Sequence, residues 1–302
     1  MSLCEKEKCT GCMACYNICS HKAIKMKSNN EGFLYPGIDK LKCVNCHLCE
    51  KVCPQINQII LVEKYEKKVF AAWQKSKAIL KKSTSGGAFS AFAKVILNRS
   101  GAVYGAGFDA NLKVVHKRIN NIKSLSELRG SKYVQSEIGD TFKQVKRDLD
   151  NGLLVLYSGT PCQIDALYSF LSKKYVGKLY TIDLVCHGVP SPLVYKEYLK
   201  YMSKKYNSKI SDIYFRYKKP GWFVFGMKIL FENGKIYEND TYHDPFIRGF
   251  LREYFLRPSC HDCQYTNINR PADITLADFW GYKETSFQDQ DNDQGISMVM
   301  IN

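Results

Sequence analysis

Two stretches near the start of the chain, CTGCMACYNIC at 9–19 and CVNCHLCEKVCP at 43–54, repeat one spacing of cysteines. Each contains C-x-x-C-x-x-C and a fourth cysteine after three more residues. A 4Fe–4S cluster needs four thiolates, and in two-cluster ferredoxins the fourth cysteine of each run ligates the other cluster. The spacing therefore predicts two clusters, whose ligands are Cys9, Cys12, Cys15 and Cys53, and Cys43, Cys46, Cys49 and Cys19.

A pair of zinc knuckles is the alternative interpretation of these cysteines. Zinc sites use four ligands and usually take them as spaced pairs with longer gaps between them. Pro54 after the last cysteine fits the bacterial ferredoxin pattern, whereas Ser20 stands at that place in the first run. Cys4 has no partner in this pattern, and we interpret it as a bystander.

Four further cysteines are scattered through the rest of the chain. Cys162 follows an expected strand in SGTPCQ, where Thr160 can cap a helix that begins at Pro161. Cys186 ends the next expected strand, and Cys260 and Cys263 form the pair in SCHDC. A third iron–sulfur site, a zinc site and unligated thiols all remain possible. We interpret the neighbouring His187 and His261 as ordinary polar residues.

Two loops have residues suited to binding an anionic cofactor. Ser85, Gly86 and Gly87 precede an expected helix, and a helix N-terminus behind paired glycines favours an anion such as a flavin phosphate. A glycine-softened helix start is the alternative. The segment GSKYVQS adds Ser131, Lys132 and Gln135. The chain has neither G-x-G-x-x-G nor a G-K-[ST] phosphate loop, so no standard dinucleotide or triphosphate site is predicted.

Composition limits the class of protein. The 302 residues allow about two domains, and 45% hydrophobic residues allow a real core. No apolar run reaches the length of a membrane span, and MSLCEKEKC lacks the apolar core of a signal peptide, which favours a cytoplasmic location. The formal charge of +15 is spread over dispersed lysines, and three clusters would reduce it to about +9. The charge therefore indicates an acidic partner or anionic cofactor, and no nucleic acid.

The elements that must position these residues alternate after a cysteine-rich start. We expect a ferredoxin-type domain at 1–57, a connector at 58–69 and a mixed α/β domain at 70–302. Helices are expected at 88–98, at a Ser124–Glu127 capping box, from Pro161 to about 173 and from about 192 to 205. Strands are expected at 101–108, 112–119, 153–158, 179–185 and 272–281, with a hairpin at Asn233-Gly234. Because two buried strands each lead into a helix, we expect them to pair in parallel.

Taken in order, six segments resemble the coenzyme F-420 hydrogenase/dehydrogenase beta-subunit family. They are TSGGAFSA, LRGSKYVQS, SGTPCQI, DLVCHGVPSP, SCHDCQY and ADITLADFWG. The resemblance implies a flavin-binding α/β catalytic domain that holds FAD, with Ser158, Thr160 and Gln163 joining the two loops above as flavin-side residues. It also favours a third cluster on Cys162, Cys186, Cys260 and Cys263. Relatives usually continue beyond GISMVMIN, so we expect a missing C-terminal portion.

Together these features predict an iron–sulfur flavoprotein oxidoreductase. Ferredoxin or a hydrogenase/dehydrogenase partner subunit would exchange electrons with the clusters, and FAD would exchange a hydride equivalent with a deazaflavin (coenzyme F-420) or another organic substrate. The alternatives are an electron relay or partner-binding subunit without substrate chemistry, and a zinc-stabilised nucleic-acid binder. The sequence singles out no catalytic acid or base.

Overall fold

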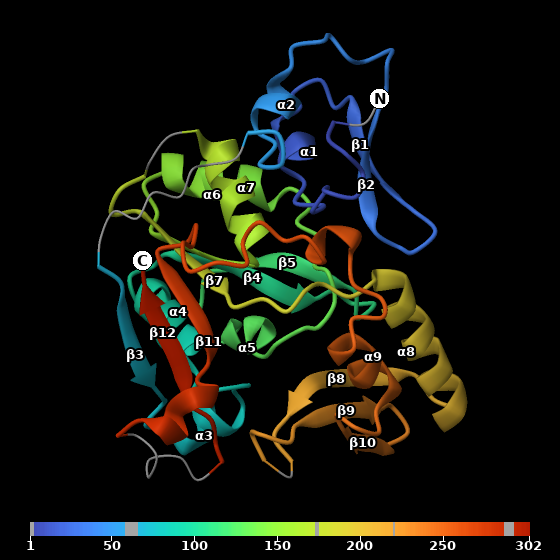
Figure 1. Cartoon of the computed structure of the whole chain (residues 1–302), viewed down its shortest axis with the longest axis vertical. Helices are drawn as coiled ribbons and strands as arrows, with labels where there is room; N and C mark the ends of the chain where they lie inside the picture. The colour runs from blue at the N-terminus through green and yellow to red at the C-terminus, as the bar shows by residue number, and fades with distance from the viewer. Residues whose placement is uncertain (1–2, 58–65, 173–174, 220, 287–292) are drawn as a thin grey trace.

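The computed structural model describes residues 3–57, 66–172, 175–219, 221–286 and 293–302 (Figure 1). The first of these ranges forms a small module around two short helices, α1 (Ala14–Ile18) and α2 (Leu48–Lys51). Between them lies an antiparallel hairpin of β1 (Ile24–Ser28) and β2 (Leu34–Ile38). Residues 58–65 of the expected connector lie outside the described residues, and its last two positions already belong to β3.

A seven-stranded mixed sheet forms the centre of the rest of the chain, in the order β3-β12-β11-β7-β6-β4-β5. Its strands are β3 (Lys68–Ala72), β4 (Ala102–Phe108), β5 (Val114–Ile119), β6 (Val155–Ser158), β7 (Leu179–Leu184), β11 (Ile274–Asp278) and β12 (Ser297–Ile301). The four strands β4, β6, β7 and β11 run parallel to one another. The expected parallel pairing of 153–158 with 179–185 is therefore confirmed.

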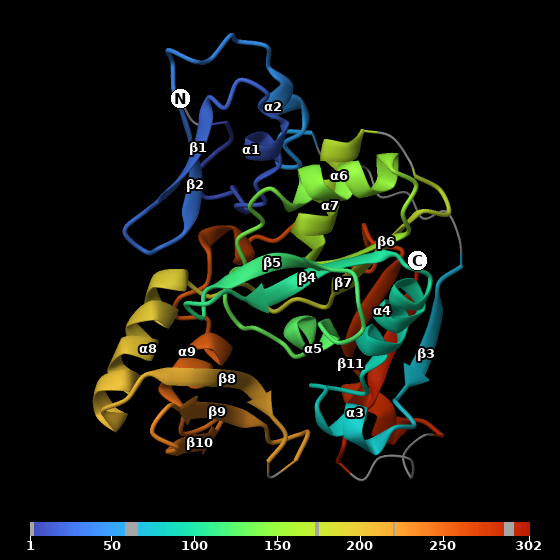
Figure 2. The same cartoon turned by 180° about the vertical axis from the view of Figure 1, so that it is seen from behind.

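Helices cover both faces of this sheet (Figures 1 and 2). On one face lie α4 (Ala88–Asn98) and α5 (Leu125–Leu128), and on the other lie α6 (Thr141–Asp150) and α7 (Pro161–Leu171). Alternate residues of β6 explain the two layers, because Leu156 packs with α4 while Val155 and Tyr157 pack with α6 and α7. A strand buried on both faces needs this continuous apolar sequence.

A second, three-stranded antiparallel sheet lies beside the first. It consists of β8 (Ile210–Tyr217), β9 (Gly226–Phe231) and β10 (Ile236–Asp240). The hairpin expected at Asn233-Gly234 joins β9 to β10, with Gly234 at φ 80°. Two helices pack on it, α8 (Pro192–Tyr206) and α9 (Pro245–Leu251), and the remaining short helices are α3 (Lys77–Lys81), η1 (Pro258–Cys260) and η2 (Trp280–Glu284).

One expected local feature is wrong. Ser124 precedes α5 as predicted, but its side chain makes no capping hydrogen bond. Glu127, the other half of the expected capping box, pairs instead with Lys117 on β5. A nearby lysine offers the carboxylate a charged partner, which is stronger than a backbone N–H at an exposed helix start.

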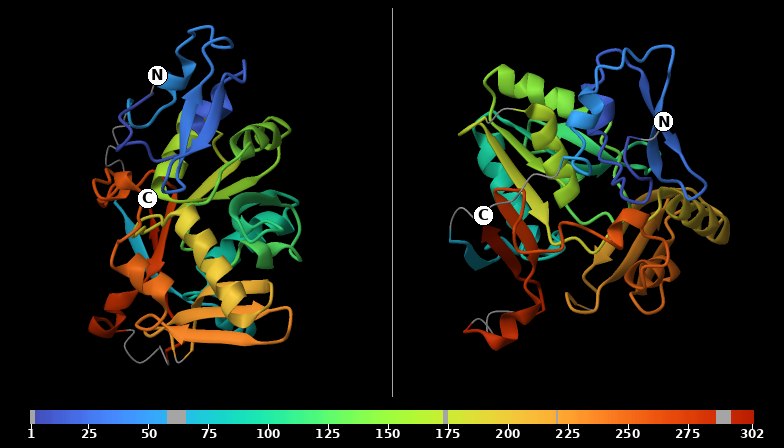
Figure 3. Two further views of the ribbon diagram at one scale, coloured as in Figure 1. Left: turned by 90° about the vertical axis from the view of Figure 1, so that its right-hand side faces the viewer. Right: turned by 45° about the horizontal axis from the view of Figure 1, so that its top comes forward.

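The cysteine-rich module packs directly on the α6–α7 face of the central sheet (Figure 3). Met13, Ala14 and Val52 of the module share one buried cluster with Phe142 of α6 and Ile164 of α7. The Asn17 amide crosses to the Gly139 carbonyl at 2.9 Å. The module therefore completes its small core with residues of the larger domain. A segment of fewer than about sixty residues is marginal in the hydrophobic core that it can bury by itself.

Within the described residues no helix is both long and apolar enough to cross a lipid bilayer. The longest, α8, has 15 residues and several lysines.

We predict that Gly86→Ala destabilises the protein by about 1–3 kcal/mol, because overpacking against backbone cannot relax. A Cβ at Gly86 would lie 2.1 Å from the Ala72 carbonyl oxygen and 2.6 Å from the Ser297 amide nitrogen. The melting temperature of the cofactor-loaded protein measures this loss. Gly281→Ala is the matched control, since a Cβ there meets nothing within 4 Å. Equal melting temperatures for the two variants would contradict the prediction.

Candidate iron–sulfur and cofactor site

The two cysteine loops adopt the same backbone conformation. Gly11 and Asn45, which precede the second cysteine of each run, have φ of 67° and 54°. Met13 and His47, which follow that cysteine, have φ of 63° and 57°. Loops that alternate left- and right-handed residues turn successive N–H groups toward one point, where they favour an anion. The sequence repeat is therefore also a repeat of local structure.

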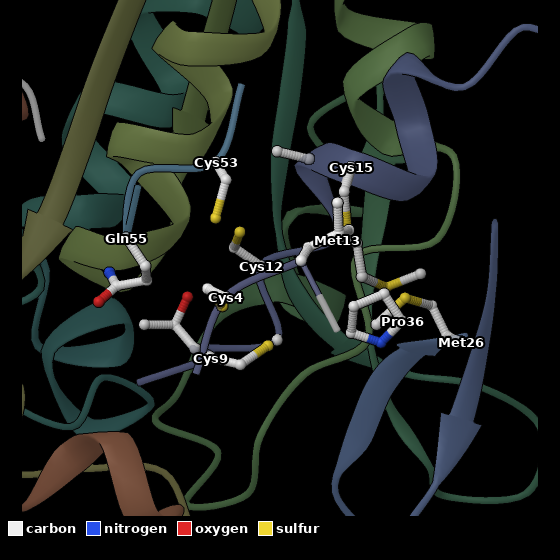
Figure 4. A pocket seen from close by; sticks show the side chains of 13 residues that line it. Cys4, Cys9, Cys12, Met13, Cys15, Met26, Pro36, Cys53 and Gln55 are labelled. Atoms are coloured by element: carbon white, nitrogen blue, oxygen red, sulfur yellow. The ribbon is translucent and has the colours of Figure 1, made fainter. Parts of the chain in front are cut away.

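Cys9, Cys12, Cys15 and Cys53 line one pocket, which Figure 4 shows from close by. Three of these cysteines come from the first run and one from the end of the second, the combination that the ferredoxin pattern predicts. Apolar side chains of Met13, Met26 and Pro36 also line the pocket. We call this the first pocket.

Cys4 also lines the first pocket, which the sequence did not indicate. Its thiol hydrogen-bonds with Cys9 and Cys53. A hydrogen bond from Cys4 lowers the pKa of Cys9 to about 6 and that of Cys53 to about 7. Cys4 is therefore a close neighbour of two predicted ligands. Spacing could not reveal this, because Cys4 lies outside the repeated run.

Burial in the first pocket disfavours the charged thiolate form of its cysteines. Burial raises the pKa of Cys12 to about 12, and it raises that of Cys15 as well. Backbone N–H groups of Ala14 and Tyr16 oppose this shift only in part. Four thiolates here need a positively charged core, and the donor set of cysteine sulfurs suits iron–sulfur clusters and zinc.

The second predicted set is more exposed than the first. Cys46 is exposed, whereas Cys43, Cys49 and Cys19 are partly buried. Cys49 belongs to α2 and Cys19 ends α1, and these two helices pack against each other. The Ala23 N–H donates to the Cys19 sulfur at 3.3 Å. Within the described ranges no three His, Cys, Asp or Glu side chains surround a single metal-ion position.

The last four cysteines, from three distant segments, meet at the carboxyl edge of the central sheet. Burial raises the pKa of Cys162, and the thiols of Cys186 and Cys260 raise it further. The pKa of Cys186, an exposed residue at this edge, is raised as well, and the thiols of Cys260 and Cys263 contribute to that shift. Parallel strands β6 and β7 end side by side, which brings Cys162 and Cys186 together. We call this group the C-terminal cysteine set.

Local hydrogen bonds fix this set. The Thr160 hydroxyl lies 3.1 Å from the Cys162 sulfur, at the start of α7. The Val189 N–H donates to the Cys260 sulfur at 3.4 Å. Pro161 begins α7 as the sequence predicts, and the Gln163 side chain accepts from the Thr160 N–H at 3.0 Å. His187 and His261 next to the set are exposed, and His187 lies 3.7 Å from Glu253.

The first pocket and the C-terminal cysteine set are neighbours. The thiol of Cys12 contributes to the raised pKa of Cys162. Arg257 touches both groups: its Nε donates to the Cys9 carbonyl at 2.6 Å, and its own carbonyl accepts from the Cys260 N–H at 2.8 Å. Sequence analysis did not identify Arg257, because nothing in LRPSC indicates a buried arginine.

The two predicted anion-binding loops lie side by side on the α4 face of the sheet. The Ser131 hydroxyl donates to the Thr84 hydroxyl at 3.3 Å. Lys132 donates to the Arg129 carbonyl at 2.9 Å, and burial lowers its pKa to about 7. Gly87 has φ 85° at the start of α4, and Gly130 has φ 87° with nothing within 4 Å of an added Cβ. This leaves space beside the second loop.

Three predicted flavin-side residues have partners within the protein. Gln135 donates to the Thr10 carbonyl at 2.8 Å and accepts from Arg257 at 2.9 Å, so it lies at the module interface. Gln163 donates to Ser136 at 3.1 Å, and Ser85 donates to the Ile296 carbonyl at 2.9 Å. Gly86 packs against β3 and β12. These contacts give each residue a structural role whatever cofactor is bound.

A buried histidine joins the cofactor loops to the sheet edge. His116 on β5 makes a 2.9 Å hydrogen bond with Ser136 and a 3.1 Å one with the Ser158 carbonyl. Its ring stacks on Tyr157 at 5.3 Å. Burial lowers the pKa of His116 to about 4, so the ring is neutral near pH 7. The alternation in VVHKRI could have indicated it, because His116 shares the inward face with Val114.

We predict that this histidine makes the protein less stable in acid. Its pKa is about 4 in the fold and about 6.5 in the unfolded chain, so the unfolded state binds more protons below pH 6.5. The neutral histidine contributes its full share of the free energy of unfolding above pH 6.5, and this contribution is lost as the pH falls toward 4. Between pH 7.5 and 5.5 the wild type should lose about 1 kcal/mol more than His116→Gln. Equal losses in denaturant titrations would contradict this.

Comparison with known proteins gives two family matches and a similar fold. Residues 8–56 match the model of the 4Fe-4S dicluster domain, and residues 153–302 match the model for the C terminus of the coenzyme F420 hydrogenase/dehydrogenase beta subunit. The fold resembles a chain of the F420-reducing [NiFe] hydrogenase complex from Methanosarcina barkeri, with a TM-score of 0.52 and 21% identity. That similarity covers 81% of this chain and 77% of the other.

Two curated relatives are archaeal-type glutamate synthases [NADPH] from Thermotoga maritima and Thermotoga sp. (strain RQ2). Each is 29% identical over 106 residues, which is 31% of this chain and only 20% of the relative. The match of residues 8–56 to the 4Fe-4S dicluster domain indicates an iron–sulfur electron-transfer protein. By its N-terminal 4Fe–4S dicluster domain and its C-terminal half, the chain belongs to the coenzyme F420 hydrogenase/dehydrogenase beta-subunit family.

Proposed function

We propose that the chain is an iron–sulfur flavoprotein oxidoreductase that moves electrons between three 4Fe–4S clusters and FAD. Its domains are a ferredoxin-type module at 1–57 and a flavin-binding domain at 70–302, joined by 58–69. One cluster is held by Cys9, Cys12, Cys15 and Cys53, and a second by Cys43, Cys46, Cys49 and Cys19. The third is held by Cys162, Cys186, Cys260 and Cys263.

One observation supports this proposal: the C-terminal cysteine set is a neighbour of the first pocket and is joined by hydrogen bonds to the second cofactor loop. Cys12 of the first pocket neighbours Cys162. The Cys162 sulfur in turn lies beside the Thr160 hydroxyl. Two residues earlier in the chain, the Ser158 carbonyl is hydrogen-bonded to His116. Neighbouring thiols at the carboxyl edge of the sheet stand where α/β folds bind ligands.

The cofactor loops suit the anionic part of a flavin. Ser131, Thr84 and Lys132 offer hydroxyl and ammonium donors, and the amide groups at the start of α4 favour a phosphate. Open space next to Gly130 leaves room for a ligand beside this backbone. FAD, when bound, supplies the conversion between one-electron and two-electron steps. The protein's own part is to bind and orient it and to place the third cysteine set nearby.

The substrate side rests on the family alone. We propose a deazaflavin (coenzyme F-420) or another small organic molecule as the hydride partner. Ferredoxin or a hydrogenase/dehydrogenase subunit is the electron partner. We propose that such a partner docks at an exposed cluster: Cys46 of the second set is exposed, as are Cys186 and Cys263 of the C-terminal set. The M. barkeri neighbour belongs to a hydrogenase complex, which supports a subunit role.

The test is an anaerobic preparation in which iron, sulfide, zinc and flavin are counted on one sample. We expect about twelve irons and one FAD per chain. Bleaching of the flavin by reduced ferredoxin, followed by reduction of added F420, would support the oxidoreductase. Iron without flavin, even after FAD is added, would leave an electron relay. Zinc in place of iron would overturn the proposal.

Cys53→Ser should remove the first cluster, whereas Cys4→Ser should keep it. Both cysteines line the same pocket, so the pair separates a ligand from a neighbour. We expect the Cys53 variant to lose about four irons per chain and the Cys4 variant to keep the full count. Iron analysis and low-temperature EPR of the reduced proteins measure this. Loss of iron in the Cys4 variant alone would reassign the fourth ligand.

Cys186→Ser tests the third cluster. It should lower the iron count by about four and leave both N-terminal clusters visible by EPR. Flavin bleaching by reduced ferredoxin should slow at least tenfold, because the intermediate station is lost. Ser169→Ala, a substitution in α7 away from the cysteines, is the control for a nonspecific effect of a single substitution. Twelve irons in the Cys186 variant would free these cysteines for another role.

A further inference from the structure

Arg257 is a fully buried cation at the junction between the module and the sheet, with 0% of its surface exposed. Its guanidinium donates to the Cys9 carbonyl at 2.6 Å, the Gln135 side-chain oxygen at 2.9 Å and the Leu34 carbonyl at 3.0 Å. It also lies over the Tyr35 ring at 4.3 Å. Every one of these acceptors is electrically neutral.

The other deeply buried arginines have a carboxylate partner. Arg216 pairs with Asp278, and Arg270 lies 3.3 Å from Asp183. No aspartate or glutamate among the described residues pairs with Arg257 in this way. Burying a charge without a counter-charge costs several kcal/mol, even when hydrogen bonds are complete. The negative charge that balances Arg257 must therefore come from another kind of group.

The cysteine sites next to Arg257 can supply that charge. Its side chain binds the backbone of Cys9, and its own backbone binds that of Cys260. A 4Fe–4S core of charge +2 held by four thiolates has a net charge of −2. With the proposed clusters bound, one such anion lies beside the Arg257 side chain, at Cys9, and another lies beside its backbone, at Cys260. The contacts of Arg257 given above involve none of the residues of the second predicted set, Cys43, Cys46, Cys49 and Cys19.

We propose that Arg257 is the shared counter-charge of the first cluster and the C-terminal cluster, and that it raises the reduction potentials of both. The inference rests on the proposed function, because it needs clusters at both sites. Each cluster takes up one electron, so its net charge changes from −2 to −3. A nearby fixed cation stabilises the more negative state, especially where water is excluded. Arg257 is a positioning and tuning residue that exchanges no electron itself.

The experiment is an EPR-monitored redox titration of the full-length, cluster-loaded protein. Arg257→Gln keeps hydrogen-bonding capacity but removes the charge, and Arg257→Lys keeps the charge. We expect the Gln variant to lower the reduction potentials of the first and C-terminal clusters by at least about 59 mV. This corresponds to a tenfold change in the equilibrium constant of a one-electron reduction. The Lys variant should shift them much less, and the second cluster should not move in either.

A second variant keeps the inference testable if Arg257→Gln fails to load iron. Gln135→Glu places a carboxylate on the guanidinium, which offsets its charge without removing it. It should lower the same two potentials, whereas Gln135→Ala should leave them close to wild type. Unchanged potentials in iron-loaded Gln135→Glu or Arg257→Gln protein would overturn the inference and leave a structural arginine. Absence of cluster signals in the wild type would instead overturn the proposed function.

Discussion

The parallel pairing of β6 with β7 is the constraint on which the rest of the site depends. Because the two strands end at one edge, the residues that follow them meet there whatever their distance in sequence. Thr160, Pro161 and the first turn of α7 bring Cys162 to that edge, and the turn after β7 brings Cys186. The loop after α9 then needs only to close over the same edge to add Cys260 and Cys263.

The position of the small module depends on the helices α6 and α7, which cover one face of the same sheet. These helices contribute Phe142 and Ile164 to one buried cluster, in which the module completes its core. This contact places the first pocket against the start of α7. The burial that stabilises the module thus also brings the two cysteine groups close together, as the proposed electron transfer requires.

Polar groups at the sheet edge contact both the cysteines and the buried histidine. The Ser158–Thr160 segment faces the cysteines with the Thr160 hydroxyl and faces His116 with the Ser158 carbonyl. His116 then connects through Ser136 to Gln163 in α7. Such a buried network is stable only when each member is satisfied. It explains why several residues that the sequence marked for cofactor contact also hold the fold together.

The sequence by itself determined the features that depend on local spacing and pattern. The C-x-x-C repeat, Pro161 at the start of α7, the Asn233-Gly234 hairpin and the parallel strands were all predictable, because each follows from a few neighbouring residues. Only the tertiary structure decided which distant groups meet. It brought Cys4 into the first pocket, gathered four cysteines from three segments, and buried Arg257 between them. No local pattern encodes these meetings, since they depend on strand order and on the docking of one domain on another.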